Sequence, residues 1–379
     1  MIYFDNAATT VPSKSAIDKA IEFNNDKFYN PSTLYNGGLN CAKEIKCAKD
    51  SILRCLGAIS NDYEVIFTSC GSESDNQAIF CTVKRGIFVT DKGEHSAVHK
   101  SFLELKNRGL SVEFIDLNKD GSVNTERLYD FIEKNSGVSF VSIMHVNNET
   151  GAINDVNTIA DRIKKINPSI IFHVDGVQAY AKLPYRLSNK IDLYSISAHK
   201  INGIKGVGAL IKRKKLNVSP LIFGGGQENG LRSGTENVFG IKVFQYATEE
   251  RALSLKENYK KVQEIKEFIA ENLDKDVFTV LSSIDSSISS PYILSVSAKG
   301  LRGEVLMHLL EMENILVGNG SACSSKNRFS RVLTACGYDE KILDGVLRIS
   351  FSPNSTMQEA EIAVKIINEK AKKLKETMR

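Results

Sequence analysis

Seven short apolar runs lie between residues 64 and 212, each with the length and the β-branched residues of a buried strand. Amphipathic segments with a helical period, such as TERLYDFIEKNS and VNTIADRIKKIN, separate most of these runs. Continuous apolar strands that alternate with helices predict an α/β fold, in which helices cover a mostly parallel, mixed seven-stranded sheet on both faces. The predicted strands are residues 64–69, 86–90, 112–117, 138–146, 169–175, 193–197 and 207–212.

The pattern changes after about residue 245. One long charged helical stretch over residues 246–273 leads into the strand-like runs YILSVSA, ILVGNG and VLRISFS, and a second helical stretch follows from residue 357. A chain of 379 residues is longer than one hydrophobic core usually supports. We therefore predict a large domain over residues 15–245 and a smaller α/β domain built from residues 1–14 and 246–379.

Polar clusters follow five of the predicted strands. In open α/β sheets, ligands bind beyond the carboxyl ends of the strands, so these clusters predict a binding site along one edge of the sheet. In chain order, the clusters are SCGSESDN, DKGEHSAV, NNETG, DGVQA and AHK.

Lys200 stands in the last cluster among serines, alanine and glycines, in the run SISAHKINGIKGVG. A lysine that binds a carbonyl group as a Schiff base needs such a partly desolvated site. Pyridoxal phosphate also needs a phosphate cup, an acidic partner for its ring nitrogen and a flat side chain against its ring. Asp175, at the end of a predicted strand, suits the ring nitrogen, while Gln178 suits the ring oxygen and His95 the stacking position.

A phosphate cup is predicted at CGSES, where a glycine-containing turn enters a helix whose free N–H groups suit an anion. Further donors come from the side chains of Ser72, Ser197 and His199. Each candidate has a structural alternative, because an aspartate at a strand end often caps a helix and a lone histidine is often a structural hydrogen-bonding residue. Taken together and in order along the chain, these residues favour a cofactor site.

Composition excludes several other classes of protein. The net charge of +4 is small for this length, and the one basic run, KRKK at 212–215, follows a predicted strand as a solvated turn, so direct nucleic-acid binding is not expected. No apolar run reaches membrane-spanning length, and the start MIYFDNAATT has no secretion signal. Seven cysteines without CxxC or zinc spacing predict reduced thiols, no metal site and a cytoplasmic protein.

In its motifs the sequence resembles the cysteine desulfurases, in the class V branch of the fold-type I pyridoxal-phosphate enzymes. The resemblance implies that the chain removes sulfur from L-cysteine and leaves L-alanine and an enzyme persulfide. The matching runs cover residue 3 to about residue 353 in the order of that family. They are YFDNAATT, NPSTLYNGG, FTSCGSESDN, EHSAV, MHVNNETG, HVDGVQ, SISAHKINGIKGVGAL, GGGQENGLRSGTEN, GSACSS and LRISFS.

The resemblance implies roles for the cofactor-site residues of this chain. Lys200 would be the Schiff-base lysine, Asp175 the partner of the pyridinium and Gln178 the donor to the ring oxygen. His95 would stack on the ring and help to move protons. The phosphate cup would be lined by Gly71, Ser72, Ser197 and His199.

The resemblance also implies how substrate, subunits and sulfur are handled. Asn148 and Arg348 match residues that hold the substrate carboxylate beside the cofactor, and Thr235 matches a threonine that reaches the phosphate from a second subunit of a homodimer. Cys323 matches the catalytic cysteine, on a predicted mobile loop over about 318–331. A loop of this length resembles those that pass sulfur to an iron–sulfur scaffold or a tRNA-thiolation enzyme.

The chain departs from the family pattern at Tyr35, where a histidine is usual, and at Cys70, where a glycine is usual and a side chain narrows the accessible φ range. Two other functions remain open. One is a selenocysteine lyase or cysteine-sulfinate desulfinase on the same scaffold. The other is an inactive partner that docks a sulfur-transfer scaffold, although such a protein should have lost the lysine, the aspartate or the loop cysteine.

Overall fold

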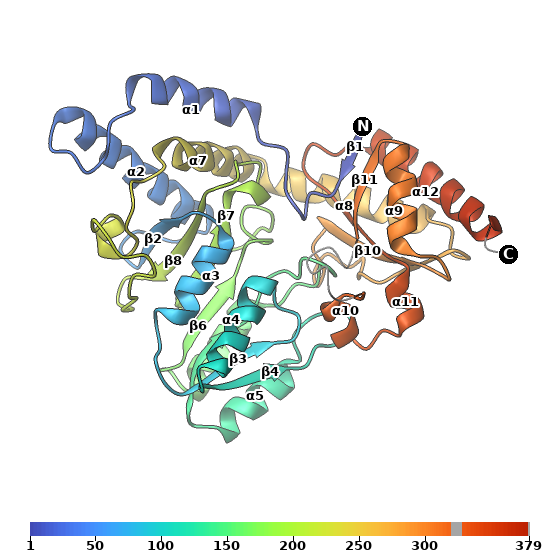
Figure 1. The fold of residues 1–379 in the computed structure, drawn as a ribbon, viewed down its shortest axis with the longest axis horizontal. Helices are drawn as coiled ribbons and strands as arrows, with labels where there is room; N and C mark the ends of the chain where they lie inside the picture. The colour runs from blue at the N-terminus through green and yellow to red at the C-terminus, as the bar shows by residue number, and fades with distance from the viewer. Residues whose placement is uncertain (320–327, 378–379) are drawn as a thin grey trace.

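The computed structural model describes residues 1–319 and 328–377, which form two β-sheets with helices packed around them (Figure 1). The neighbouring strands from β7 to β4 pair in parallel, whereas β8 pairs antiparallel with both β2 and β7. The predicted mostly parallel, mixed seven-stranded sheet is therefore confirmed. Within the described residues, its strand order is β2 (Tyr63–Thr68), β8 (Gly208–Arg213), β7 (Leu193–Ser197), β6 (Ile171–Asp175), β5 (Val138–Ser142), β3 (Ile87–Asp91), β4 (Ser111–Ile115).

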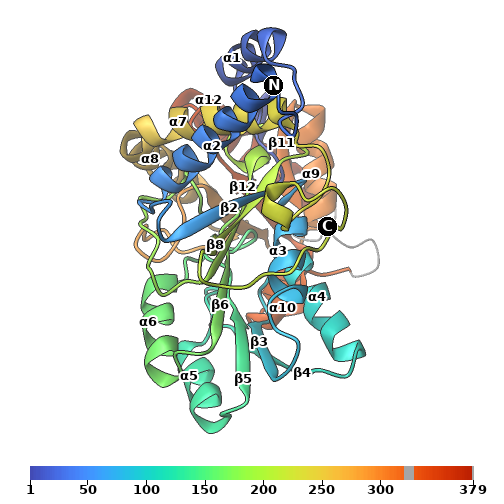
Figure 2. The same cartoon turned by 90° about the vertical axis from the view of Figure 1, so that its left-hand side faces the viewer.

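Helices cover both faces of this sheet, which explains why its strands are apolar throughout rather than alternating. One face is covered by α3 (Gly71–Phe80) and α4 (Ser96–Asn107). The other face is covered by α2 (Asn36–Cys55), α5 (Thr125–Lys134), α6 (Val156–Ile166) and α7 (Val238–Leu253). Figure 2 shows α5 and α6 on the opposite side of the strands from α3 and α4. The helices predicted at TERLYDFIEKNS and VNTIADRIKKIN correspond to α5 and α6.

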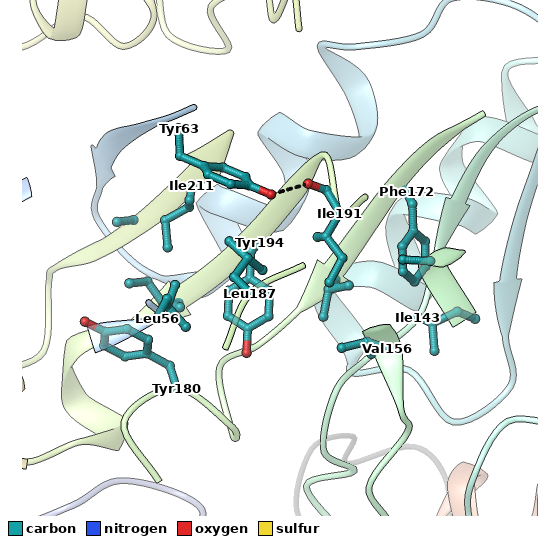
Figure 3. Packing of buried hydrophobic residues seen from close by; sticks show 14 of the residues in the cluster. Leu56, Tyr63, Ile143, Val156, Phe172, Tyr180, Leu187, Ile191, Tyr194 and Ile211 are labelled. Carbon is teal, nitrogen blue, oxygen red and sulfur yellow. Dashed lines mark hydrogen bonds between the residues drawn. The ribbon is translucent and has the colours of Figure 1, made fainter. Parts of the chain in front are cut away.

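The core between the sheet and this second group of helices contains large aromatic side chains (Figure 3). Tyr63, on the edge strand β2, turns its ring into the core, and its hydroxyl group donates to the carbonyl oxygen of Ile191 over 2.9 Å. Tyr180 and Tyr194 are also buried there. A buried ring contributes a large apolar area, and its hydroxyl group must find a partner. Tyr180 lies in the segment that follows β6 and Tyr194 lies on β7, so this packing holds the ends of both strands in place.

The second sheet has five strands within the described residues, in the order β1 (Ile2–Phe4), β11 (Ile315–Asn319), β12 (Val346–Ser350), β10 (Ile293–Ala298), β9 (Phe278–Val280). β1 pairs in parallel with β11, with Ile2 opposite Ile315, so the N-terminal segment joins the C-terminal part of the chain. The strands predicted from YILSVSA, ILVGNG and VLRISFS correspond to β10, β11 and β12. The helices that pack on this sheet are α8 (Leu255–Asn272), α9 (Gly303–Met312) and α12 (Met357–Thr377).

The remaining α-helices of the described residues are α1 (Lys14–Asp26), α10 (Arg331–Ala335) and α11 (Glu340–Asp344). α1 packs on α7 through Ala16, Ala20, Val243 and Ala247. None of the helices in residues 1–319 and 328–377 combines the length and the hydropathy needed to cross a membrane.

The single helical stretch predicted over residues 246–273 is wrong, because two helices occupy it. α7 ends and α8 begins at Ser254, whose φ and ψ are −114° and 23°. Before this residue, Ile241 and Phe244 of α7 pack under the larger sheet, and after it Val262 and Ile265 of α8 pack on the smaller one. The bend thus lets the chain pass from one sheet to the other. The domain boundaries at residues 14 and 245 stay a prediction.

Candidate active site

A cavity of about 680 Å³ lies where the carboxyl ends of β6 and β7 face the smaller sheet. Its walls combine residues from both sheets, such as Asp175 at the end of β6 and Arg348 on β12. Of the twelve residues predicted as site residues, ten line this cavity: Gly71, Ser72, His95, Asn148, Asp175, Gln178, Ser197, His199, Lys200 and Arg348.

Lys200 lies in the short 3₁₀ turn η1 (Ala198–Lys200), which directly follows β7. Its ammonium group donates to the carbonyl oxygens of Ala7, at 2.6 Å, and Ala8, at 2.7 Å. Both carbonyl groups belong to the segment after β1, so the chain that leaves the smaller sheet supplies the acceptors. Backbone oxygens therefore hold the lysine at the cavity wall.

Asp175 and His95 lie together in this wall, with a carboxylate oxygen and a ring nitrogen within 4.8 Å. Burial raises the pKa of the Asp175 carboxyl, whereas His95, the Val177 amide and Lys200 lower it. His95 caps α4, because its Nδ1 accepts from the Ala97 amide over 3.2 Å. Burial lowers the pKa of His95, so the ring is neutral and its hydrogen is on Nε2.

The start of α3 forms a corner of the cavity that suits an anion. Cys70 occupies the N-cap but its thiol makes no capping hydrogen bond, which leaves the first N–H groups of the helix to other partners. The buried Oγ of Ser197 has no hydrogen-bond partner among the described residues. A methyl group at Gly71 would lie only 2.8 Å from Cγ2 of Val177, so glycine leaves the necessary room.

Gln178 is oriented by two neighbours. Its Nε2 donates to the carbonyl oxygen of Ala7 over 2.9 Å, and its Oε1 accepts from the ammonium group of Lys182 over 2.7 Å. Lys182 is almost fully buried, and burial together with nearby cations lowers its pKa well below the usual value. The amide nitrogen of Gln178 and the Nζ of Lys200 therefore meet at the same carbonyl oxygen on the cavity wall.

Arg348 projects from β12 with its guanidinium group held by two acceptors. One terminal nitrogen lies 2.9 Å from Oδ1 of Asp5, and the other donates to the carbonyl oxygen of Asn148 over 3.0 Å. Its Nε is buried and has no hydrogen-bond partner in the described part of the chain. A fixed guanidinium group with one donor to spare suits a small carboxylate.

Two predicted site residues lie elsewhere. Thr235 lines a separate cavity of about 170 Å³, together with Arg232 and Glu236, so this chain does not bring it to the other ten. Cys323 lies outside the described residues. Asn319, directly before that segment, and Phe329, the second described residue after it, both line the larger cavity.

The two departures from the family pattern have different surroundings. Tyr35 is more than half exposed, and its ring packs edge-on against that of Tyr29. It occupies the N-cap position of α2 without a capping hydrogen bond from its side chain, and it is not among the described residues that line the larger cavity. Cys70 does line it, but its φ of −172° is extended backbone that any residue adopts. The expected constraint on turn geometry at Cys70 is therefore absent. At the same corner, burial and Lys200 lower the pKa of His199 to about 4, so its ring is neutral.

Two cavity residues stand inside the quoted motifs without having been singled out. Asp5, in YFDNAATT, pairs with Arg348 across the cavity floor. Asp75, in FTSCGSESDN, lies one helical turn after Gly71 and reaches the vicinity of Asp175. The i, i+4 spacing from Gly71 is the signal that could have placed Asp75 on the cavity side of α3.

Comparisons with known proteins cover nearly the whole chain. A family model described as aminotransferase class V matches residues 2–362. The protein named cysteine desulfurase IscS from Methanosarcina thermophila is 34% identical over 381 residues, which cover 99% of this chain and 93% of that protein. A solved NifS-like protein has a TM-score of 0.89 at 33% identity, covering 97% of this chain and 98% of its own. A structure titled SspA in complex with cysteine has a TM-score of 0.79 at 29% identity, covering 93% and 99%.

Proposed function

Because the chain belongs to the class V aminotransferase family, we propose that it is a cysteine desulfurase, which converts L-cysteine to L-alanine and a persulfide on Cys323. The observation that carries this proposal is the cavity at the ends of β6 and β7. It combines an amine at Lys200, a buried carboxyl group at Asp175 and a guanidinium group at Arg348. These are the groups needed to bind an aromatic aldehyde and an amino acid side by side.

The residues present fit pyridoxal phosphate, which members of this family use. The unpartnered Oγ of Ser197 and the start of α3 suit its phosphate, and the room kept by Gly71 suits their close approach. Burial disfavours the ionised form of the Asp175 carboxyl group, and a positively charged pyridinium nitrogen beside it would favour that form again. Lys200, just beyond the carboxyl end of the neighbouring parallel strand β7, would hold the aldehyde carbon.

When bound, this cofactor withdraws electrons from the amino acid and so weakens the bond between the β-carbon and the sulfur. The residues of the chain would bind the substrate and move protons. Arg348 would hold the substrate carboxylate through its spare Nε, and Asn148 would flank it. Lys200 would move a proton at its Nζ, and His95, being neutral, would accept or donate one.

Cys323 would attack the sulfur of the substrate as a thiolate, so that the C–S bond breaks and a persulfide forms on the enzyme. Asn319 and Phe329, which lie close to Cys323 in the sequence, support this role, because both line the cavity. We further propose a cytoplasmic homodimer that passes the sulfur to an iron–sulfur scaffold or a tRNA-thiolation enzyme, as the family resemblance implies.

The test is to measure alanine and sulfide released from L-cysteine, with and without reductant, by the wild type and two variants. Lys200→Ala should lose the visible absorbance of the bound cofactor, because the amine that holds it is gone. Cys323→Ala should keep this absorbance and lose alanine release, and Cys336→Ala serves as the matched control. Full turnover by the Cys323 variant would disprove the mechanism, and a colourless wild type that does not take up pyridoxal phosphate would disprove the proposed function.

A further inference from the structure

A second carboxyl group lies beside Asp175. Asp75, on α3, is almost fully buried and lines the same cavity. One oxygen of Asp75, one oxygen of Asp175 and one ring nitrogen of His95 all lie within 4.8 Å of one another. Two ionised carboxylates so close together in a buried place repel each other strongly, so one of them keeps its proton.

The neighbours decide which carboxyl group that is. Asp175 has the Val177 amide and Lys200 beside it, and both favour the ionised form. The Asp75 carboxyl has a hydroxyl hydrogen bond from Ser195 as its sole support, against burial and the charge of Asp175. These two effects raise the pKa of Asp75 well above its usual value.

Other charged groups near Asp75 do not reverse this order. The Nε2 of His173, on β6, lies 3.6 Å from Oδ1 of Asp75, but burial lowers the pKa of His173 to about 3 and keeps it neutral. Cys70, at the start of α3, disfavours a charge on Asp75. The Glu94 carboxyl, before α4, is fully buried and its pKa is also raised well above the usual value. Within the described residues, Asp75 forms no ion pair with a lysine or arginine.

Hydrogen bonds that join Ser142, His173 and Ser195 fix the residues beside Asp75. The ring of His173 bonds with Ser142 at Nδ1 over 2.8 Å and with Ser195 at Nε2 over 2.9 Å. Both ring nitrogens are therefore engaged by hydroxyl groups. Oδ1 of Asp75 is buried and has no hydrogen-bond partner in the described part of the chain. The ionised acceptor near this carboxyl group is Asp175, one oxygen of which lies within 4.8 Å of an oxygen of Asp75.

We propose that Asp75 is a positioning residue, whose protonated carboxyl group donates toward Asp175 and keeps that residue ionised against the ring nitrogen of the cofactor. The gap of at most 4.8 Å is closed by a rotation of the carboxyl group or by one bridging water. A hydrogen bond donated by Asp75 makes the Asp175 carboxylate a weaker base. The proton between Asp175 and the cofactor therefore stays on the ring nitrogen. The consequence for the cofactor rests on the proposed function, whereas the first test below does not.

The first test is infrared spectroscopy of the full chain, before and after loading with pyridoxal phosphate. At about pH 8, where ordinary aspartates are ionised, the carbonyl stretch of protonated carboxylic acids should be stronger in the wild type than in Asp75→Asn, while the contribution of the buried Glu94 stays in both. A wild type and Asp75→Asn with identical spectra in this region would overturn the inference. This readout needs no turnover, so it stands even if the protein does not release alanine from cysteine.

The second test compares Asp75→Asn with Asp75→Ala in the loaded protein. Asparagine keeps a neutral donor, so the pH midpoint of the cofactor absorbance should stay near that of the wild type. Alanine removes the donor, so the midpoint should move and kcat/KM for cysteine should fall about 10-fold. Ile79→Val, a buried apolar change on the same helix, controls for disturbed packing and should shift nothing. Equal shifts in the asparagine and alanine variants would show that Asp75 acts through its charge and would overturn the inference.

Discussion

At the scale of single residues, Arg348 depends on Asp5 for its orientation. The two side chains approach to 2.9 Å, and both are largely buried. The carbonyl oxygen of Asn148 holds the other terminal nitrogen, so the planar guanidinium group has two fixed contacts. If Asp5 loses its charge, one of these contacts weakens and the group is free to turn.

We expect Asp5→Asn to raise the KM for cysteine about 10-fold while kcat and the cofactor absorbance change little, since Asp5 orients the group that would bind the substrate carboxylate. Steady-state kinetics on the loaded enzyme measure this. Glu304→Gln is the matched control, because Glu304 pairs with Arg302 on the surface and its neutralisation should leave KM unchanged. An unchanged KM in Asp5→Asn would separate Arg348 from substrate binding.

How far single residues could be predicted depends on whether their role is local. Asp175 ends one strand and Lys200 lies in the turn after the next, so the strand pattern alone puts them at one edge of the sheet. Asp75 has the pattern of an ordinary polar residue in a helix, and its proximity to Asp175 arises only when α3 packs on the sheet. Thr235 lacks any local signal that distinguishes it from a loop residue.

At the scale of elements, the start of α3 shows how tightly one helix is fitted to its neighbours. Gly71 begins the helix, and a methyl group there would lie 2.8 Å from Cγ2 of Val177. Val177 belongs to the turn after β6 that also presents Asp175 and Gln178. A larger residue at 71 therefore pushes the helix and this turn apart.

We expect Gly71→Ala to weaken pyridoxal-phosphate binding about 10-fold, because overpacking of this kind costs about 1–3 kcal/mol and displaces the helix start. Spectroscopic titration with the cofactor measures the change. The double variant Gly71→Ala/Val177→Ala should recover most of the affinity, since the second change removes the clashing methyl group. If the double variant binds no better than Gly71→Ala, the contact with Val177 is not the cause.

Strands were more predictable than the joint between the helices α7 and α8. All seven strands of the larger sheet match apolar runs, because burial on both faces leaves a local signature. The break at Ser254 has neither glycine nor proline beside it, so the sequence shows one helical stretch. The break follows from packing, since α7 and α8 serve different sheets.

At the scale of the whole molecule, the separate cavity around Thr235 matters most. Thr235 lines a different cavity from Lys200. Phe223 lies, like Thr235, in the segment that connects β8 to α7. It has 80% of its surface exposed, which is unusual for so large an apolar side chain. Both observations support the proposal that this face meets a second copy of the chain.

A mixing experiment tests this proposal. We expect Lys200→Ala to be inactive, and Thr235→Asp to bind the cofactor poorly because it places a carboxylate beside the phosphate. After exchange between equal amounts of the two variants, about half of all dimers combine both chains. If Thr235 serves the partner's cavity, each of these dimers contains one intact site of two, so about a quarter of wild-type activity should return. Size-exclusion chromatography must show that each variant is dimeric. No recovery after subunit exchange would show that Thr235 acts within its own chain.

The pairing of β1 with β11 has a consequence for biosynthesis. Residues 2–4 leave the ribosome long before residues 315–317, yet each is the other's neighbour in the finished sheet. The carbonyl groups of Ala7 and Ala8, which accept hydrogen bonds from the ammonium group of Lys200, lie in the segment that follows β1. A nascent chain can thus complete its helices and most of its larger sheet during translation, but the wall behind the lysine closes only once synthesis has nearly ended.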